Sequence, residues 1–325
     1  MRRFIAIFFL LFSLNASLQA SELKDYGPVA EFAGIDSWIN SKPLTKDSLK
    51  GKVVLVDFWT YTCVNCIRTL PHLKEWYQKY KNKGFVIVGV HSPEFDFEKN
   101  PANVKQAVSK LQIPYPIALD NKMATWEAYQ NNAWPAHYFI DAKGHIRHVH
   151  LGEGSYEESE AVIQALLAEA SQKPESQSTT QPSTLPTTQP MRDAKGDVDF
   201  SQIQSPETYL GFSRRERLVT SGRPLNLNEW NFEGKWRTEG ERILLTESTG
   251  KIRFHFSAPK VNLVIHPGPV VGKAIVRLDG KTVNTFEINE PRMYELINLG
   301  PKGEEHIIEI EFLTPGVSAY AFTFG

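Results

Sequence analysis

The chain contains two cysteines, Cys63 and Cys66, and the residues around them favour thiol–disulfide exchange. They follow an apolar, β-branched run at residues 53–56, which is typical of a buried strand, and Asp57 comes directly after that run. From residue 67 onward, apolar side chains recur at helical spacing, so the pair is predicted on the first turn of a helix. Unpaired N–H groups and the helix dipole favour a negative charge there, and the thiolate is the reactive form of cysteine.

This placement suggests a different role for each of three side chains. Cys63, at the helix start, would attack a partner's disulfide. Cys66, one turn further in, would resolve the mixed disulfide by attacking the sulfur of Cys63. Asp57 would lie beneath the pair on the strand, where ionisation is costly, and would exchange a proton with Cys66.

Other interpretations of the same residues remain open. The cysteines could form a structural disulfide, although a bridge across two intervening residues closes too small a loop to add much stability. They could supply half of a zinc site, with histidines completing it. Asp57 could be a strand-end residue whose carboxylate is satisfied by the backbone.

The segment VDFWTYTCVNC resembles the thioredoxin active site, with Asp57, Trp59, Cys63 and Cys66 at the spacing of that family. Pro71 stands where thioredoxins carry a helix-kinking proline. The wider stretches DFWTYTCVNCIRTLPHLKEWY, GVHSPEFDFEK and YPIALDNKMATWEAY are similar to the extracytoplasmic part of DipZ-type thiol:disulfide interchange proteins, a branch of the TlpA-like thioredoxins. The resemblance covers most of the mature chain.

The resemblance implies an α/β thioredoxin-like fold that acts on protein disulfides or dithiols. It implies a cis peptide bond before Pro135, facing the cysteines, with Trp59, Trp134 and Pro135 in the substrate-binding surface. Backbone beside such a proline can pair with a substrate strand. No cofactor is expected beyond a redox-active Cys63–Cys66 disulfide. DipZ proteins carry a membrane electron-conducting domain ahead of this region, so a separate membrane electron-transfer partner is expected here.

Composition divides the 325 residues into four parts. Residues 1–20 are predicted to be a signal peptide, with Arg2 and Arg3 before an apolar run, although an uncleaved anchor is the alternative. A thioredoxin-like domain at 21–170, a Ser/Thr/Gln/Pro-rich linker at 171–195 and a second domain at 196–325 follow. We therefore expect a periplasmic or otherwise extracytoplasmic protein, and the formal charge of −1 does not favour nucleic-acid binding.

The second domain is predicted to be an all-β jelly-roll sandwich, because short alternating strands are separated by Gly and Pro. The predicted strands are residues 231–236, 242–246, 251–256, 261–265, 274–278, 282–288, 294–298, 306–312 and 319–324. It resembles the carbohydrate-binding-like module of DipZ proteins, so a carbohydrate or protein ligand is possible. Trp230, Trp236, Tyr294 and Tyr320 could stack on sugars, but core positions are favoured for each.

Two alternative functions remain open at this stage. A redoxin-type thiol peroxidase would use Thr60, Thr62 and Arg68 near an activated cysteine, although the Cys-x-x-Cys spacing fits dithiol exchange better. The chain could also be a binding module with an inactive thioredoxin scaffold. His148 and His150 share a strand face, but no acid or cysteine is interleaved at ligand spacing, so no metal site is expected.

Overall fold

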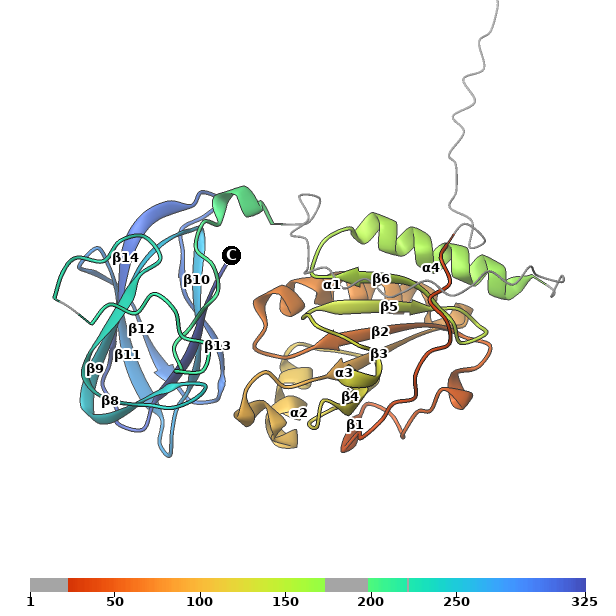
Figure 1. Cartoon of the computed structure of the whole chain (residues 1–325), viewed down its shortest axis with the longest axis horizontal. Helices are drawn as coiled ribbons and strands as arrows, with labels where there is room; N and C mark the ends of the chain where they lie inside the picture. Colours follow the sequence, from red (N-terminus) through yellow and green to blue (C-terminus); the bar gives the residue numbers. More distant parts are fainter. Residues whose placement is uncertain (1–22, 173–197, 221) are drawn as a thin grey trace, which may run out of the picture.

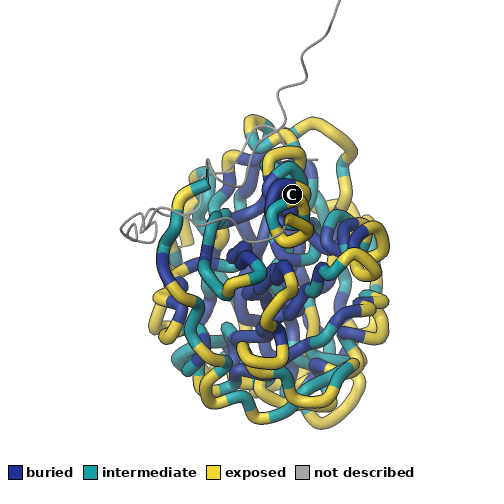
Figure 2. The backbone as a smooth tube through the Cα atoms, turned by 90° about the vertical axis from the view of Figure 1, so that its right-hand side faces the viewer, coloured by how far each residue is buried: buried dark blue, intermediate teal, exposed yellow. Residues whose placement is uncertain are grey.

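The computed structural model describes residues 23–172, 198–220 and 222–325, which form two domains lying side by side (Figure 1). The predicted signal peptide and most of the predicted linker, residues 173–195, lie outside the described residues. Among the helices that are described, none is both long and apolar enough to span a bilayer. Buried segments occupy the interior and exposed loops the periphery (Figure 2).

The first domain is built on a six-stranded mixed sheet with the order β1-β4-β3-β2-β5-β6. Its strands are β1 (Ser37–Ile39), β2 (Val53–Trp59), β3 (Phe85–His91), β4 (Ile117–Leu119), β5 (Ala136–Ile140) and β6 (Ile146–Leu151). Its helices are α1 (Val64–Tyr80), α2 (Pro101–Lys110), α3 (Ala124–Ala128) and α4 (Tyr156–Ser171). This arrangement confirms the predicted thioredoxin-like α/β fold.

Strand β2 lies at the centre of this sheet, and all of its residues are buried. It pairs in parallel with β3 through the α1 crossover, as the βαβ pattern predicts, and antiparallel with β5. Side chains of α1, α2 and α4 cover one face, whereas α3 and residues 26–44 cover the other. Strand β2 therefore ends in the interior of the domain, and the short loop that follows it leads directly into α1.

Helix α1 begins where the sequence predicts, and it ends at Tyr80, one 3₁₀ turn before Gly84. Cys63 is its N-cap residue, and Gly84 terminates the following 3₁₀ turn in a left-handed conformation, with φ of 86°. Pro71 lies inside the helix. The buried face includes Cys66, Leu70 and other apolar side chains, so packing anchors the helix while its first turn stays near the surface.

The second domain is a nine-stranded antiparallel sheet folded into two layers. Its strands are β7 (Thr208–Tyr209), β8 (Trp230–Thr238), β9 (Ile243–Ala258), β10 (Lys260–His266), β11 (Gly272–Leu278), β12 (Lys281–Ile288), β13 (Arg292–Asn298), β14 (Glu304–Phe312) and β15 (Ser318–Phe324). The all-β sandwich is thereby confirmed, and the layers enclose an apolar core.

One predicted strand break in this domain is wrong. The sequence predicts separate strands at residues 242–246 and 251–256, but both ranges fall in the 16-residue strand β9, which begins at Ile243. Exposed Glu, Ser and Thr between them have the composition of a turn. Instead, Gly234 of β8 and Gly250 of β9 face each other at a register shift, where the two strands bend together. A side chain at Gly250 would collide with Leu245 and Trp236, so this close approach requires glycine.

The two domains share an apolar interface. Phe95 from the first domain packs against Tyr320 of β15, with ring centroids 5.0 Å apart, and Phe97 lies 4.8 Å from the same ring. Both Phe95 and Tyr320 are almost completely buried. Polar contacts surround this cluster, including the ion pair between Arg214 and Glu94 at 2.8 Å. In Figure 1 the sandwich presents β10 and β13 on the side nearest the first domain.

Tyr320→Ala should weaken this interface, because it removes the ring on which Phe95 and Phe97 pack. We expect a loss of about 3 kcal/mol in the free energy of unfolding of the sandwich and a larger radius of gyration in small-angle scattering. Phe212→Ala, which removes a ring that is 60% exposed, is the matched control. An unchanged radius of gyration in the Tyr320 variant would show that the domains are held together by other contacts.

Candidate active site

The structure places the two cysteines as the sequence predicts, at the junction between β2 and α1. Both are free thiols; Cys63 is half-buried and Cys66 is completely buried. The backbone N–H of Cys66 donates a hydrogen bond to Sγ of Cys63 over 3.2 Å. The sulfur thus accepts a direct hydrogen bond at the N-terminus of the helix. Cys63 is the more accessible of the two thiols.

Cys66 has the opposite environment. Its burial raises the pKa of the thiol well above the usual 9.0, and the neighbouring Cys63 and Asp57 raise it further. The thiol is therefore neutral at rest, and it can attack only if a neighbouring group takes its proton. Asp57, one of the groups that raise the pKa of Cys66, is the candidate for taking this proton.

Asp57 lies on β2 and is 1% exposed. Neither of its carboxylate oxygens accepts a hydrogen bond from any described residue, so backbone does not satisfy it. Its nearest basic partner is His137 of β5, whose Nε2 lies 3.4 Å from Oδ1. Burying a carboxylate that accepts no hydrogen bond is energetically costly.

Sequence reasoning missed His137. The two residues are 80 positions apart, and they meet because β5 pairs with β2 in a register that sets His137 opposite Asp57. His137 also stacks on His150, with ring centroids 6.2 Å apart. Within the described part of the chain, no three His, Cys, Asp or Glu side chains are arranged to hold a metal ion.

Glu98 is a second residue that sequence reasoning missed. Its carboxylate is completely buried and accepts hydrogen bonds from two loops, at residues 60–62 and at residues 94–95. The hydroxyls of Thr60 and Thr62 each donate to Oε1 over 2.6 Å, and the backbone N–H groups of Glu94 and Phe95 donate to Oε2 over 2.7 and 3.0 Å. Glu98 thereby joins the loop before Cys63 to the loop that contacts the sandwich.

The predicted substrate-binding residues fall in different environments. The Trp134–Pro135 peptide bond is cis, as the family resemblance implies, and the Trp134 indole donates a hydrogen bond to the carbonyl of Ser92 over 3.0 Å. Trp134 lines the cavity at Cys63. Trp59 is only 1% exposed and packs edge-on against His91, in the core. A role of Trp59 in substrate binding stays a prediction, because this side chain has almost no exposed surface that a substrate could contact.

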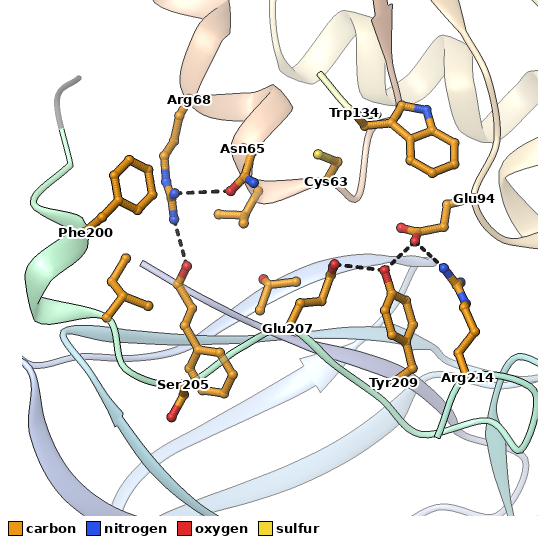
Figure 3. A pocket seen from close by; sticks show the side chains of 14 residues that line it. Cys63, Asn65, Arg68, Glu94, Trp134, Phe200, Ser205, Glu207, Tyr209 and Arg214 are labelled. Carbon is orange, nitrogen blue, oxygen red and sulfur yellow. Dashed lines mark hydrogen bonds and ion pairs between the residues drawn. The ribbon is translucent and has the colours of Figure 1, made fainter. Parts of the chain in front are cut away.

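Cys63 opens into a cavity of about 150 Å³ between the two domains (Figure 3). Asn65, Arg68, Glu94 and Trp134 line it from the first domain. The sandwich contributes the opposite wall, formed by Phe200, Ile203, Ser205, Glu207, Tyr209, Arg214, Thr323 and Phe324. The sulfur of Cys63 therefore faces a cleft and not an open surface.

The aromatic residues considered for sugar stacking are mostly internal. Trp230 and Tyr294 are buried in the sandwich core, in agreement with the favoured interpretation, and Tyr320 is buried in the domain interface. Trp236 is half-buried against the same core. These four rings do not form one exposed platform.

Comparisons with known proteins agree with this architecture. The Redoxin family model matches residues 31–167, and the model described as thioredoxin-like C-terminal domain matches residues 205–325. A solved thioredoxin-like protein in the oxidized form is 30% identical, covering 46% of this chain and 98% of that one, with a TM-score of 0.41. The fold, the N-cap cysteine and the buried cysteine one turn later define a thioredoxin-type dithiol protein.

Two relatives indicate to which branch of the thioredoxin family the chain is similar. Protein DipZ of Mycobacterium bovis is 34% identical over 96% of this chain, which covers 45% of DipZ. The thiol-disulfide oxidoreductase YkuV of Bacillus subtilis is 30% identical over 44% of this chain and 95% of YkuV. The chain belongs to the DipZ-like thiol:disulfide interchange proteins of the thioredoxin family. It spans less than half the length of DipZ.

Glu98→Gln should remove a pH dependence of stability. Burial raises the pKa of Glu98 from its ordinary 4.5 to about 7, so the folded state binds more protons than the unfolded state between these values. The free energy of unfolding of the wild type should therefore fall by about 3 kcal/mol as pH rises from 4.5 to 7. The glutamine variant should lack that fall.

Denaturant unfolding at several pH values measures this effect. At pH 4.5 both oxygens of the protonated Glu98 carboxyl group can still accept hydrogen bonds, whereas the amide nitrogen introduced by Glu98→Gln cannot, so we expect this variant to be less stable by about 2 kcal/mol at that pH. Glu127→Gln, at an exposed position on α3, is the control. If the free energy of unfolding depended on pH in the same way for the wild type and for Glu98→Gln, Glu98 would not be the group responsible for the pH dependence.

Proposed function

We propose that this protein is an extracytoplasmic thiol–disulfide oxidoreductase that exchanges disulfides with other proteins. One observation carries the proposal: a half-buried Cys63 that accepts a hydrogen bond at the start of α1 lies next to a buried Cys66 and the unsatisfied carboxylate of Asp57. The redox group is the cysteine pair itself. The name of the relative YkuV, a thiol-disulfide oxidoreductase, supports the same class of reaction.

In the reductive direction, the Sγ of Cys63 attacks one sulfur of a substrate disulfide. A Cys63–substrate bond forms, the substrate's own bond breaks, and one substrate thiolate leaves. Asp57 accepts the proton of Cys66, whose sulfur then attacks Cys63 and releases the second thiolate. The substrate gains two electrons and the protein holds a Cys63–Cys66 disulfide. The reverse sequence oxidises a substrate dithiol.

Repeated reduction requires a supply of two electrons per cycle. The apolar segment at residues 1–20 supports export, and disulfides persist outside the cytoplasm. A separate membrane electron-transfer protein would then deliver the electrons. It would reach Cys63 through the same cleft as the substrate.

The alternative of a thiol peroxidase is less well supported. Peroxidase chemistry needs polar donors free to bind a peroxide beside the cysteine. Here the hydroxyls of Thr60 and Thr62 donate to Glu98. Arg68 binds the carboxylate of Glu153 over 2.8 Å and the carbonyl of Phe324 over 2.9 Å.

Cys66→Ser should trap substrates as mixed disulfides. Cys63 would still attack, because its sulfur keeps its place at the helix start and the hydrogen bond from a backbone N–H that the serine variant retains. The complex would persist, since serine is too weak a nucleophile to break a disulfide near neutral pH. Non-reducing gels of cells that express the variant should show adducts that dithiothreitol releases.

Cys63→Ser is the matched control and should give no adducts. Adducts from Cys63→Ser alone would reverse the two roles. Absence of adducts from either variant would favour a binding module with an inactive scaffold. Several trapped exported proteins would indicate substrates, whereas one dominant membrane protein would indicate the electron donor.

Asp57→Asn should slow turnover without preventing trapping. Asparagine fills the same space but cannot accept the proton of Cys66, so resolution of the mixed disulfide should slow by roughly 100-fold, in the range for a lost general base. In the Cys66→Ser background the same change should matter little. Stopped-flow measurement of single-turnover reduction separates attack from resolution; equal slowing of both steps would contradict a role confined to Cys66.

A further inference from the structure

The sandwich domain forms half of the cavity that holds the reactive thiol. Phe200, Ile203 and Phe324 give this wall an apolar end. Phe200 lies on the side of Arg68 in Figure 3, and the carbonyl of Phe324 accepts a hydrogen bond from Arg68. Ile203 and Phe324 are largely buried, whereas Phe200 is half-buried and turns toward the cavity. The opposite end, near Glu94, carries Tyr209 and Arg214 (Figure 3).

Direct contacts hold the two walls at a fixed separation. The guanidinium of Arg68 donates to the carbonyl of Phe324, from the first domain to the last strand of the sandwich. At the other end of the cavity, Tyr209 donates to Glu94 over 2.7 Å and Arg214 pairs with the same carboxylate. The cavity is thus bounded at both ends by contacts between the domains.

The size of the cavity limits what can reach Cys63. A volume of about 150 Å³ corresponds to on the order of five water molecules. It admits one or two side chains and excludes a folded domain. A disulfide set flush in a globular surface could not reach the sulfur, whereas a cysteine in an extended segment could.

The charged residues around the cavity favour a substrate in which the residue beside the reacting cysteine is uncharged. Arg68, Arg214 and Glu94 are already paired with groups of the protein. The fourth charged residue of the lining, Glu207, accepts a hydrogen bond from the Tyr209 hydroxyl over 2.8 Å. A charged substrate side chain would lose water at the apolar end without gaining a partner, which is unfavourable, while an apolar one would gain burial.

We propose that the cleft between the domains is a peptide-binding site that selects an extended cysteine-containing segment with an apolar residue beside the cysteine. The inference rests on the proposed exchange reaction and assigns the sandwich a part in substrate selection. Phe200 is the residue on which the selected side chain packs. The cysteine of the segment meets Cys63, and its neighbour lies at the apolar end.

Two peptides test this inference on the full-length reduced protein. Each carries one cysteine as a mixed disulfide with 5-thio-2-nitrobenzoate, and they differ only in having Leu or Asp beside it. Release of the coloured thiolate reports kcat/KM. We expect the wild type to prefer the Leu peptide by about tenfold, as burial of part of a leucine side chain allows.

Variants at Phe200 should change that ratio. Phe200→Ala should reduce it to about twofold. Phe200→Arg should reverse it toward the Asp peptide, a gain that misfolding cannot produce. Phe212→Ala, at a ring 60% exposed elsewhere on the sandwich, should leave the tenfold ratio unchanged.

The outcomes separate this inference from the proposed function. Equal rates for both peptides in the wild type, or an unchanged ratio in both Phe200 variants, would overturn the binding site while thiolate release shows the exchange reaction intact. No release from either peptide or from the free aromatic disulfide would overturn the proposed function and, with it, this inference.

Discussion

The buried carboxylate of Glu98 is the interaction on which the rest of the site depends. It accepts hydrogen bonds from Thr60 and Thr62, which precede Cys63, and from the backbone N–H groups of Glu94 and Phe95. Phe95 in turn packs on the sandwich. Through this one side chain, the loop that precedes Cys63 is connected to the loop that packs on the second domain. Its burial is costly, and four accepted hydrogen bonds offset that cost.

Sequence reasoning worked where the determining interactions are local. The strand at β2, the turn and the first turn of α1 are contiguous, so apolar pattern and helix-start chemistry were enough to place Cys63 and Cys66. The sandwich was predictable because it is built of short strands, many of them alternating, and the turns between them carry Gly, Pro or Asp. The exception was β9, where exposed residues at a paired bend have the composition of a turn.

The remaining parts of the site depend on tertiary contacts between distant residues. Glu98 is one acid among many in the sequence, and only folding brings it beneath Thr60. His137 becomes relevant through the register between two strands. The cleft requires the relative placement of two domains, which no periodicity encodes. A charged residue within the aromatic stretch EFDFEK was the one available signal for Glu98, and a solvated loop explains that pattern equally well.

Strand β9 has a consequence for how the cleft is maintained. Because this one strand pairs with β14 over residues 250–258 and with β15 at Ile243 and Leu244, the two layers of the sandwich share a single backbone. Neither layer can open without disrupting the hydrogen bonds of the other, so the sandwich should behave as one cooperative unit in native-state hydrogen exchange. The wall opposite Cys63, which includes Phe324 of β15, would then persist as long as the whole domain stays folded.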